Sequence, residues 1–239
     1  GKRAWYGMFP QLGAPIGFFL ATGVFLLLTG GMNDAEFFTW GWRVPFLGSA
    51  VLVLVGLWIR LKLVETPEFQ RAIEREERVR LPMLVVLTQH PRALLAGIVG
   101  SISTFVVFYL MAVFALNWGT TKLGYTREQF LWIQMLGVAC FAAFIPVTAL
   151  IAQRRGARAA MLLATVLIFA FGFAFAPLFA AGSLGSTMLF VALGMSLAGM
   201  TYGPVGTLLA SLFPTAVRYT GSSLAFNLSA ILGASLAPY

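Results

Sequence analysis

Few side chains in this 239-residue sequence could carry out acid–base, nucleophilic or metal chemistry. It contains one histidine, His90, which precedes Pro91, and one cysteine, Cys140, which lies in an apolar run. Hydrolytic chemistry needs a nucleophile beside a base, and metal binding needs clustered ligands. Neither pattern occurs, and the motifs His-Glu-x-x-His and Gly-x-Ser-x-Gly are absent from the sequence. We therefore expect no catalytic residue, no metal site and no cofactor, and hence no enzyme.

The polar residues of greater interest are uncharged and lie inside long apolar stretches. Tyr109 and Tyr202 fall near the centres of their stretches, and five others lie elsewhere along theirs: Gln11, Asn117, Gln134, Thr207 and Asn227. A polar side chain in hydrocarbon needs a partner, so each either bonds a neighbouring helix or faces a water-filled cavity. These seven are the candidate substrate-binding residues, with helix packing as the alternative for each.

The composition requires lipid around most of the chain. Hydrophobic residues make up 59% and charged residues 10%, against roughly 45–50% and 25% in a soluble domain. The net charge of +8 could indicate a nucleic-acid partner in a soluble protein. Here the basic residues lie between apolar stretches, where they are better explained by membrane orientation. We expect membrane lipid, and no nucleic acid, as a partner.

The uncharged stretches give the membrane-spanning segments, because about 20 helical residues cross the hydrocarbon of a bilayer. They run over 4–33, 44–59, 93–121, 129–153, 159–217 and 219–239. The stretch at 159–217 would be roughly 88 Å long as one helix, so it must fold back. The polar segment 181–186 is the obvious turn. Seven helices result, so the sequence predicts an all-α, multi-pass membrane protein.

The basic residues divide unequally between the two sides of these helices. With the start of the chain inside, thirteen are cytoplasmic: Lys2, Arg3, seven from Arg60 to Arg92, Arg154, Arg155, Arg158 and Arg218. Only Arg43, Lys122 and Arg127 fall on the other side. Loops rich in lysine and arginine stay in the cytoplasm. The sequence therefore predicts one orientation.

The only sizeable polar segment, 65–91, separates two helices in 1–64 from five in 92–239. We expect a cytoplasmic linker there. Thr66 can cap a helix, Pro67 suits its first turn, and oppositely charged residues recur at four-residue spacing, so 67–80 should be helical. The apolar stretch 81–87 is too short to span and is expected along the membrane interface.

Small residues cluster in two of the predicted helices. Gly13 and Gly17 flank Pro15, and a second group lies in one later helix: Gly194, Gly199, Gly203, Pro204 and Gly206. Such residues let helices pack closely, and they also permit the bends that gating requires. Both roles suit a carrier with a polar path between its helices.

Particular runs of the sequence resemble the metabolite:proton symporters, a family within the major facilitator superfamily. They are Leu-Phe-Pro-Thr-Ala-Val-Arg-Tyr-Thr-Gly-Ser-Ser-Leu at 212–224, Trp-Gly-Trp-Arg-Val-Pro-Phe-Leu at 40–47 and Glu-Thr-Pro-Glu-Phe at 65–69. Tyr-Gly-Pro-Val-Gly at 202–206 is a weaker signal in the same order. The resemblance covers essentially the whole chain.

The resemblance implies a major facilitator fold of about twelve helices in two halves, of which this chain is a fragment covering about helices five to eleven. Residues 1–64 would then be the last two helices of the N-terminal half, 65–91 the linker, and 92–239 the first five helices of the C-terminal half, the last one possibly truncated. Relatives take up organic acids or zwitterions together with protons. The implied location is a bacterial inner membrane.

The loop Ile-Ala-Gln-Arg-Arg-Gly-Ala-Arg at 151–158 resembles a superfamily loop motif, with departures. The motif usually has an aspartate where this chain has Gln153, and relatives tend to have a glutamate where it has Ser211. In the family these acids help to hold the cytoplasmic helix ends together. By this resemblance, the expected gating residues are Gln153, Arg154, Gly156, Arg158, Ser211 and Arg218.

The function predicted from these observations is secondary transport: import of a small metabolite with protons by alternating access. The alternative is a non-transporting membrane receptor or scaffold on the same fold. A channel is disfavoured, because no ring of charged side chains or filter-like repeat is visible in the sequence.

Overall fold

A computed structural model describes residues 5, 7–62, 81–179 and 182–236, and the regular elements of these residues are helices. The long helices are α2 (Phe9–Gly31), α4 (Val44–Lys62), α7 (Pro91–Tyr109), α9 (Arg127–Arg155), α10 (Ala157–Phe179), α11 (Leu184–Leu212) and α12 (Arg218–Leu236). Shorter ones are α3 (Asp34–Thr39), α6 (Pro82–Gln89) and α8 (Ala115–Thr121). The helix predicted at 67–80 lies outside the described residues.

Six helical segments of the described residues are long and apolar enough to cross a membrane. They are Phe9–Gly31, Gly41–Lys62, Pro91–Thr121, Arg127–Arg155, Ala157–Phe179 and Leu184–Leu212. The seventh predicted span is also a helix, α12 with 19 residues, but it falls outside this set. Its polar side chains, which begin at Arg218 and end at Ser235, lower its hydropathy.

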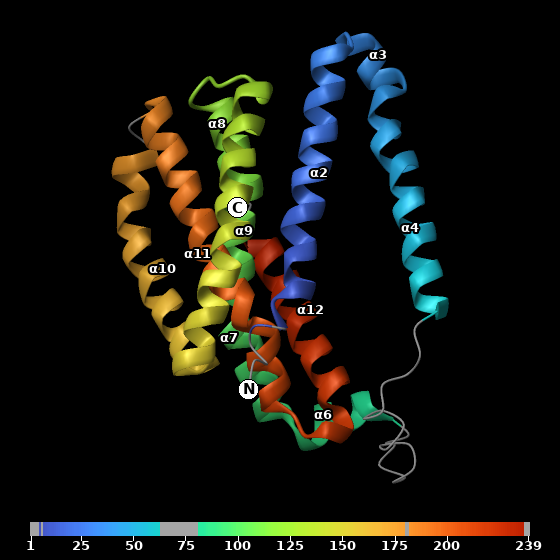
Figure 1. The fold of residues 1–239 in the computed structure, drawn as a ribbon. Helices are drawn as coiled ribbons and strands as arrows, with labels where there is room; N and C mark the ends of the chain where they lie inside the picture. The colour runs from blue at the N-terminus through green and yellow to red at the C-terminus, as the bar shows by residue number, and fades with distance from the viewer. Residues whose placement is uncertain (1–4, 6, 63–80, 180–181, 237–239) are drawn as a thin grey trace. The chain divides into compact units, whose positions relative to one another are not determined.

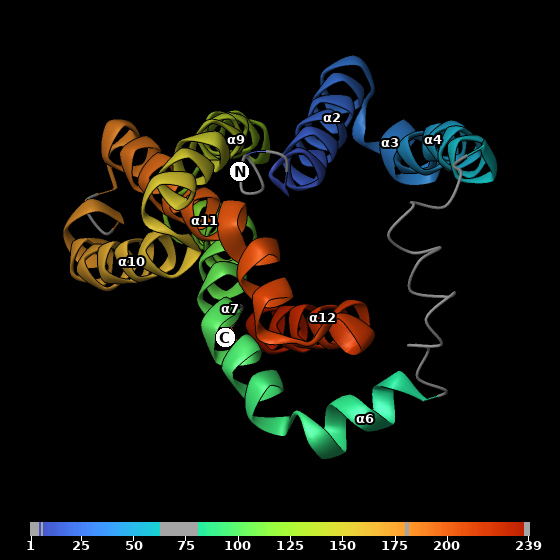
Figure 2. The same cartoon turned by 60° about the horizontal axis from the view of Figure 1, so that its bottom comes forward.

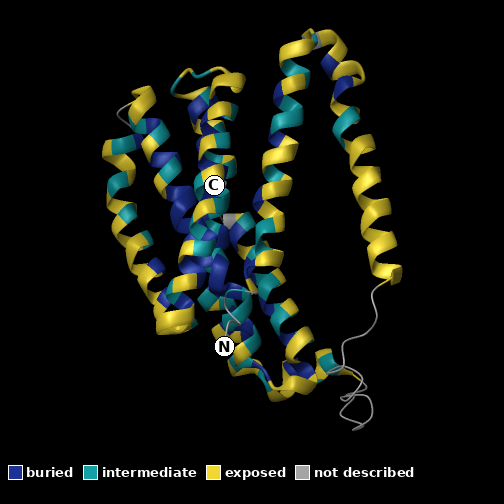
Figure 3. Cartoon of the chain, viewed as in Figure 1, coloured by how far each residue is buried: buried dark blue, intermediate teal, exposed yellow. Residues whose placement is uncertain are grey.

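The chain divides into two compact units. One consists of residues 1–19 with 81–239, and the other of residues 20–80, so α2 contributes to both. The first unit contains α6 to α12, with α11 packed against α9, α10, α7 and α12 (Figures 1 and 2). Its core is continuous from Phe130 on α9 to Phe190 on α11, and both residues are completely buried. Figure 3 shows the buried residues in dark blue, concentrated on the inner helices of this unit.

Glycines bring the backbones of α9 and α11 close together. A methyl group at Gly203 would lie 2.8 Å from the Ile145 carbonyl oxygen, and one at Gly199 would collide with the Phe141 carbonyl oxygen. Gly199 and Gly203, four residues apart on α11, thus face Phe141 and Ile145, which are four residues apart on α9. This arrangement is typical of tightly packed membrane helices. For Gly199 and Gly203, the packing role is the one that the structure supports.

The helix formed by α7 and α8 contains a π-helical turn, η2 (Leu110–Phe114). The side-chain amide of Gln134 on α9 donates a hydrogen bond of 2.6 Å to the Ala112 carbonyl oxygen in this turn. A π-turn disturbs the regular backbone ladder, so a carbonyl within it gains from a side-chain donor. Gln134, which is 2% exposed, therefore bonds a neighbouring helix.

Short connections join the helices of the first unit. A connection falls within the segment 181–186 predicted as a turn, but it is shorter: α10 ends at Phe179, the Ser183 hydroxyl caps α11, and residues 184–186 already belong to α11. The Tyr125 hydroxyl lies 3.1 Å from the Gly182 carbonyl oxygen and 3.2 Å from the Thr187 hydroxyl oxygen. This tyrosine therefore fastens the loop before α9 to the loop before α11.

The second unit is a helical hairpin. The second half of α2 leads through α3 and the short helix η1 (Gly41–Arg43) into α4. Asn33 and Glu36 form a capping box that starts α3, a helix the sequence did not predict. Each end of α4 has a cation over an indole ring, Arg43 over Trp42 at 4.7 Å and Lys62 over Trp58 at 4.4 Å.

Candidate substrate site

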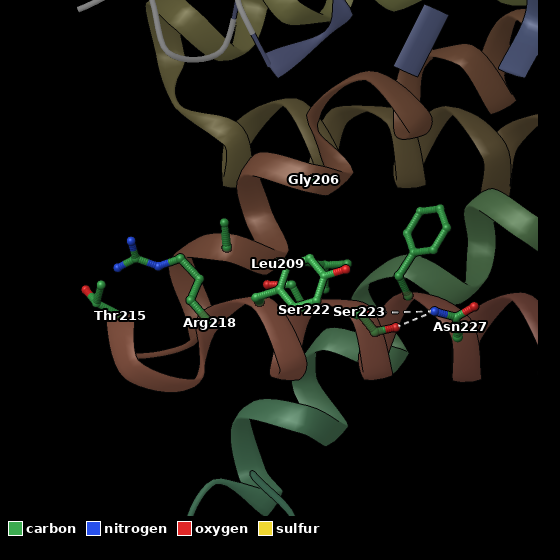
Figure 4. Close-up of a pocket in the computed structure, with 10 residues that line it drawn as sticks. Gly206, Leu209, Thr215, Arg218, Ser222, Ser223 and Asn227 are labelled. Atoms are coloured by element: carbon green, nitrogen blue, oxygen red, sulfur yellow. Dashed lines mark hydrogen bonds between the residues drawn. The ribbon is translucent and has the colours of Figure 1, made fainter. Parts of the chain in front are cut away.

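A pocket of about 590 Å³ lies in the first unit between the C-terminal part of α11, the short helix η3 (Thr215–Val217) and the first half of α12 (Figure 4). Its lining combines apolar groups with a guanidinium, a carboxamide and several hydroxyls. The residues are Gly206, Leu209, Ala210, Thr215, Arg218, Tyr219, Ser222, Ser223, Phe226 and Asn227. A volume of this size is usual for a small-molecule site.

The turn between α11 and α12 forms one end of this pocket. Pro214 follows α11, whose C-cap Phe213 is extended, and η3 then leads directly into α12. A methyl group at Gly221 would collide with the Phe213 ring, so the glycine lets this buried ring pack against α12. The resulting tight turn places Thr215 and Arg218 beside α11.

Two polar side chains stand at opposite ends of the α12 wall. Figure 4 shows Arg218 near Thr215 at one end and Asn227 at the other, with Ser222 and Ser223 between them. Nine residues of helix correspond to about 14 Å along its axis. The Arg218 Nε donates to the Phe213 carbonyl oxygen at 3.4 Å, and the Asn227 Nδ2 donates to the Ser223 carbonyl oxygen at 2.8 Å.

The apolar wall is fixed by aromatic packing. The Phe226 ring packs edge-on against Phe105 of α7, with 4.9 Å between ring centroids. Tyr202 packs against Phe226 at 6.4 Å and against Phe141 of α9 at 5.4 Å. Leu209 is 1% exposed, so this wall is part of the folded core.

Four of the predicted substrate residues lie in or beside the pocket. Asn227 lines it directly, and Tyr202 contacts the lining residue Phe226. Thr207 follows the lining residue Gly206, and a methyl group at Gly206 would lie 3.0 Å from the Gln11 side-chain nitrogen. The Tyr202 hydroxyl has no hydrogen bond to any described residue.

The other three predicted substrate residues lie elsewhere. Tyr109 ends α7 and packs against Phe108 with 5.7 Å between ring centroids. Asn117 is exposed on α8, where its backbone carbonyl accepts from Thr121 at 2.6 Å. Gln134 bonds the π-turn, as described above. The pocket does not include these three residues.

The predicted gating residues surround two helix ends. Gln153, Arg154 and Arg158 are exposed around Gly156, whose φ of 86° suits glycine and which caps α9. Ser211 is exposed and donates to the Leu208 carbonyl oxygen at 2.6 Å. Arg218 is the only one of the six that lines the pocket.

Sequence reasoning did not identify Thr215, Tyr219, Ser222, Ser223 and Phe226 as site residues. A signal was available in the run at 218–227. Arg218 precedes Ser222 by four residues, and Ser223 precedes Asn227 by four, so each pair shares a helix face.

The sequence profile of the Major Facilitator Superfamily matches residues 4–238. The chain belongs to this superfamily. It is thus an integral membrane protein of a transporter superfamily, and an enzyme function is not indicated. The chain is 46% identical to the inner membrane metabolite transport protein YhjE of Escherichia coli, and the match covers 100% of this chain and 55% of that protein.

Two further superfamily relatives are transporters of Escherichia coli. The shikimate transporter is 31% identical over 100% of this chain and 55% of its own length, and the proline/betaine transporter is 28% identical over 99% and 49%. These names agree with the resemblance found in the sequence. The chain spans about half the length of the curated relatives it matches. No solved structure matched it.

Proposed function

We propose that the protein is a secondary transporter of the bacterial inner membrane that imports a small organic acid or zwitterion together with protons. Relatives named for metabolite, shikimate and proline/betaine transport support this choice. The single structural observation behind it is the pocket between α11 and α12, which offers reversible polar and apolar contacts to a small molecule. Its size and mixed lining favour a metabolite over a bare ion.

The proposal includes the arrangement expected from the sequence. Residues 1–64 end one half of the transporter, 65–91 form a cytoplasmic linker, and 92–239 belong to the other half. Tyr202, Gln11, Thr207 and Asn227 contribute to a substrate path, and rocking of the two halves exposes it alternately to each side of the membrane. Tyr109 and Asn117 remain candidates for that path at a greater distance from the pocket.

We assign gating to the cytoplasmic ends of the helices. Arg154, Gly156 and Arg158 form the tight connection after α9, and Ser211 and Arg218 flank the turn between α11 and α12. With Gln153 and Ser211 in place of acids, the arginines can meet only neutral acceptors at these positions. A hydrogen bond between opposite charges is stronger than one from a guanidinium to a neutral acceptor, so we expect a weak cytoplasmic latch.

Uptake into sealed vesicles tests the proposed function. The protein, produced with whatever sequence flanks these residues in its gene, is reconstituted, and accumulation of labelled organic acids and zwitterions is followed with the outside acidified. Accumulation that stops when a protonophore is added supports proton-coupled transport. Specific binding without any accumulation would instead favour a receptor or scaffold.

A further inference from the structure

The pocket between α11, η3 and α12 has a positive charge at one end. Arg218 is the one charged side chain among the ten described residues that line it, and none of these ten carries a carboxylate. Its Nε donates to the Phe213 carbonyl oxygen, and the guanidinium has no other hydrogen bond to a described residue. The two terminal nitrogens can therefore bind both oxygens of a carboxylate, the geometry that a guanidinium favours.

Ser222 provides a second group at the same end. It follows Arg218 by one helical turn and lines the same pocket, so the two side chains share a face of α12. Its hydroxyl oxygen is buried and has no hydrogen-bond partner among the described residues. An unpaired buried hydroxyl is costly, and rotation of the Ser222 side chain toward the pocket would let a ligand oxygen beside Arg218 become its partner.

The other end of the pocket has the opposite preference. The Asn227 Nδ2 lies 2.8 Å from the Ser223 carbonyl oxygen and 3.4 Å from the Ser223 hydroxyl oxygen (Figure 4). Because the amide hydrogens are directed at Ser223, the Asn227 Oδ1 is left as an acceptor. It can accept a hydrogen bond from an O–H or N–H group, and it forms no such bond with a methyl group.

We propose that this pocket binds a carboxylic acid in a fixed direction. Arg218 and Ser222 hold the carboxylate, Phe226 contacts the apolar body, and the Asn227 Oδ1 accepts from a hydroxyl or N–H group at the far end. This inference rests on the proposed function and makes it more specific. Acids that carry a distal donor are preferred to fully methylated or donor-free analogues.

A matched series of ring acids tests the assignment on the purified protein with its flanking sequence. A ligand at free concentration L stabilises the folded protein by RT ln(1 + L/Kd), so at equal concentration the tighter ligand gives the larger rise in unfolding temperature. We expect para-hydroxybenzoate to bind more tightly than para-methoxybenzoate, which lacks the donor, and than para-hydroxybenzamide, which lacks the charge. Losing the bond between the carboxylate and the guanidinium should cost about tenfold or more in affinity, and losing the neutral bond to Asn227 about two- to tenfold.

Substitutions then assign each preference to its residue. Arg218→Gln should bind the acid and the amide equally, and Arg218→Lys should keep part of the difference. Asn227→Leu should abolish only the preference for hydroxyl over methoxy. Arg92→Gln, which removes a basic residue outside the pocket, is the control and should keep both preferences.

The outcomes separate this inference from the proposed function. If Arg218→Gln still prefers the acid, or if the parent binds none of the series, the assigned site is wrong even where gradient-driven uptake occurs. If both preferences behave as expected and no uptake is seen, the site stands and the transport proposal fails. If Arg218 acts in gating alone, Arg218→Gln should change the affinity for acid and amide by the same factor, and that result would also contradict the assignment.

Discussion

The hydroxyl oxygens of Ser101 on α7 and Ser229 on α12 lie 2.7 Å apart, and both residues are completely buried. Each oxygen also lies close to a carbonyl of its own helix, at 2.6 Å from Gly97 and 2.7 Å from Ala225. One hydroxyl can therefore donate across the interface while the other donates to the backbone. This pair satisfies its polar groups without water and supports the α12 wall of the pocket.

Replacement of Ser229 by alanine should weaken the contact between α7 and α12. Interhelical hydrogen bonds in membranes contribute about 0.6 to 2 kcal/mol, so the expected loss of stability is of that size. The measurement is the midpoint of thermal unfolding in detergent. Ser235→Ala is the control, because the Ser235 hydroxyl is exposed and donates only to the Ile231 carbonyl of its own helix. Equal shifts in the two variants would contradict the role of the buried pair.

Alanine at the α11 glycines should destabilise the protein in a graded order. Gly203 faces the rigid Ile145 carbonyl, so Gly203→Ala must separate two helices. Gly194 faces the Met111 side chain, which can change rotamer, so Gly194→Ala should cost less. Gly185→Ala meets open space and should be neutral or stabilising by up to about 1 kcal/mol. The yield of monodisperse protein after heating ranks the three variants, and a harmless Gly203→Ala would refute the close approach.

Tyr202→Phe should lower uptake while leaving the fold intact. The change keeps the ring between Phe141 and Phe226 and removes only a hydroxyl that bonds no described residue. If that hydroxyl bonds a charged substrate, the loss is roughly 1.5–3 kcal/mol, seen as weaker apparent affinity. Tyr125→Phe is the matched control. It removes the bonds to Gly182 and Thr187, so stability should fall and transport affinity should not. A stability loss alone in Tyr202→Phe would indicate a packing role.

Hydropathy and charge were sufficient to predict the all-helical fold and most helix boundaries, because each span must satisfy its own backbone in lipid. The turn at Gly182 and Ser183 was likewise readable from its small polar residues. The π-turn at 110–114 was not, since it depends on a tertiary partner, Gln134, that is far away in the sequence. Local propensity carries no information about such a bond.

The candidate site was predictable only in part. Asn227 and Tyr202 stand out as polar residues in apolar helices, and the structure places them in or beside one pocket. Tyr109 has the same sequence signature, yet it packs against Phe108 away from that pocket. Depth along a helix follows from residue number, whereas the direction that a side chain faces depends on how the helices pack.

Membrane orientation can be tested with single cysteines in a background that carries Cys140→Ala. The distribution of basic residues predicts that Ser183 faces outward and Arg155 faces the cytoplasm. Both residues are exposed. An impermeant thiol reagent applied to intact cells should label Ser183→Cys and spare Arg155→Cys, and lysis should make both reactive. Labelling in the reverse order would overturn the predicted orientation.

Restoring acids at the cytoplasmic helix ends should shift the transporter toward the outward-facing state. Gln153 and Ser211 are exposed, and the Ser211 hydroxyl is directed at its own helix, so neither offers Arg218 a charged partner. We expect the double variant Gln153→Asp, Ser211→Glu to strengthen the latch. Each kcal/mol gained changes the ratio of the two states about fivefold.

Thiol accessibility reports that shift. Ala210→Cys lines the pocket near its predicted cytoplasmic end, so its labelling from the cytoplasmic side should slow in the acidic double variant. The matched control Gln153→Asn, Ser211→Gln alters the same two positions without charge and should label at the parent rate. Equal slowing in both would show that side-chain size closes the pocket. Unchanged labelling in the acidic variant would mean that the neutral residues already latch as well as acids do, with Arg218 satisfied by the Phe213 carbonyl.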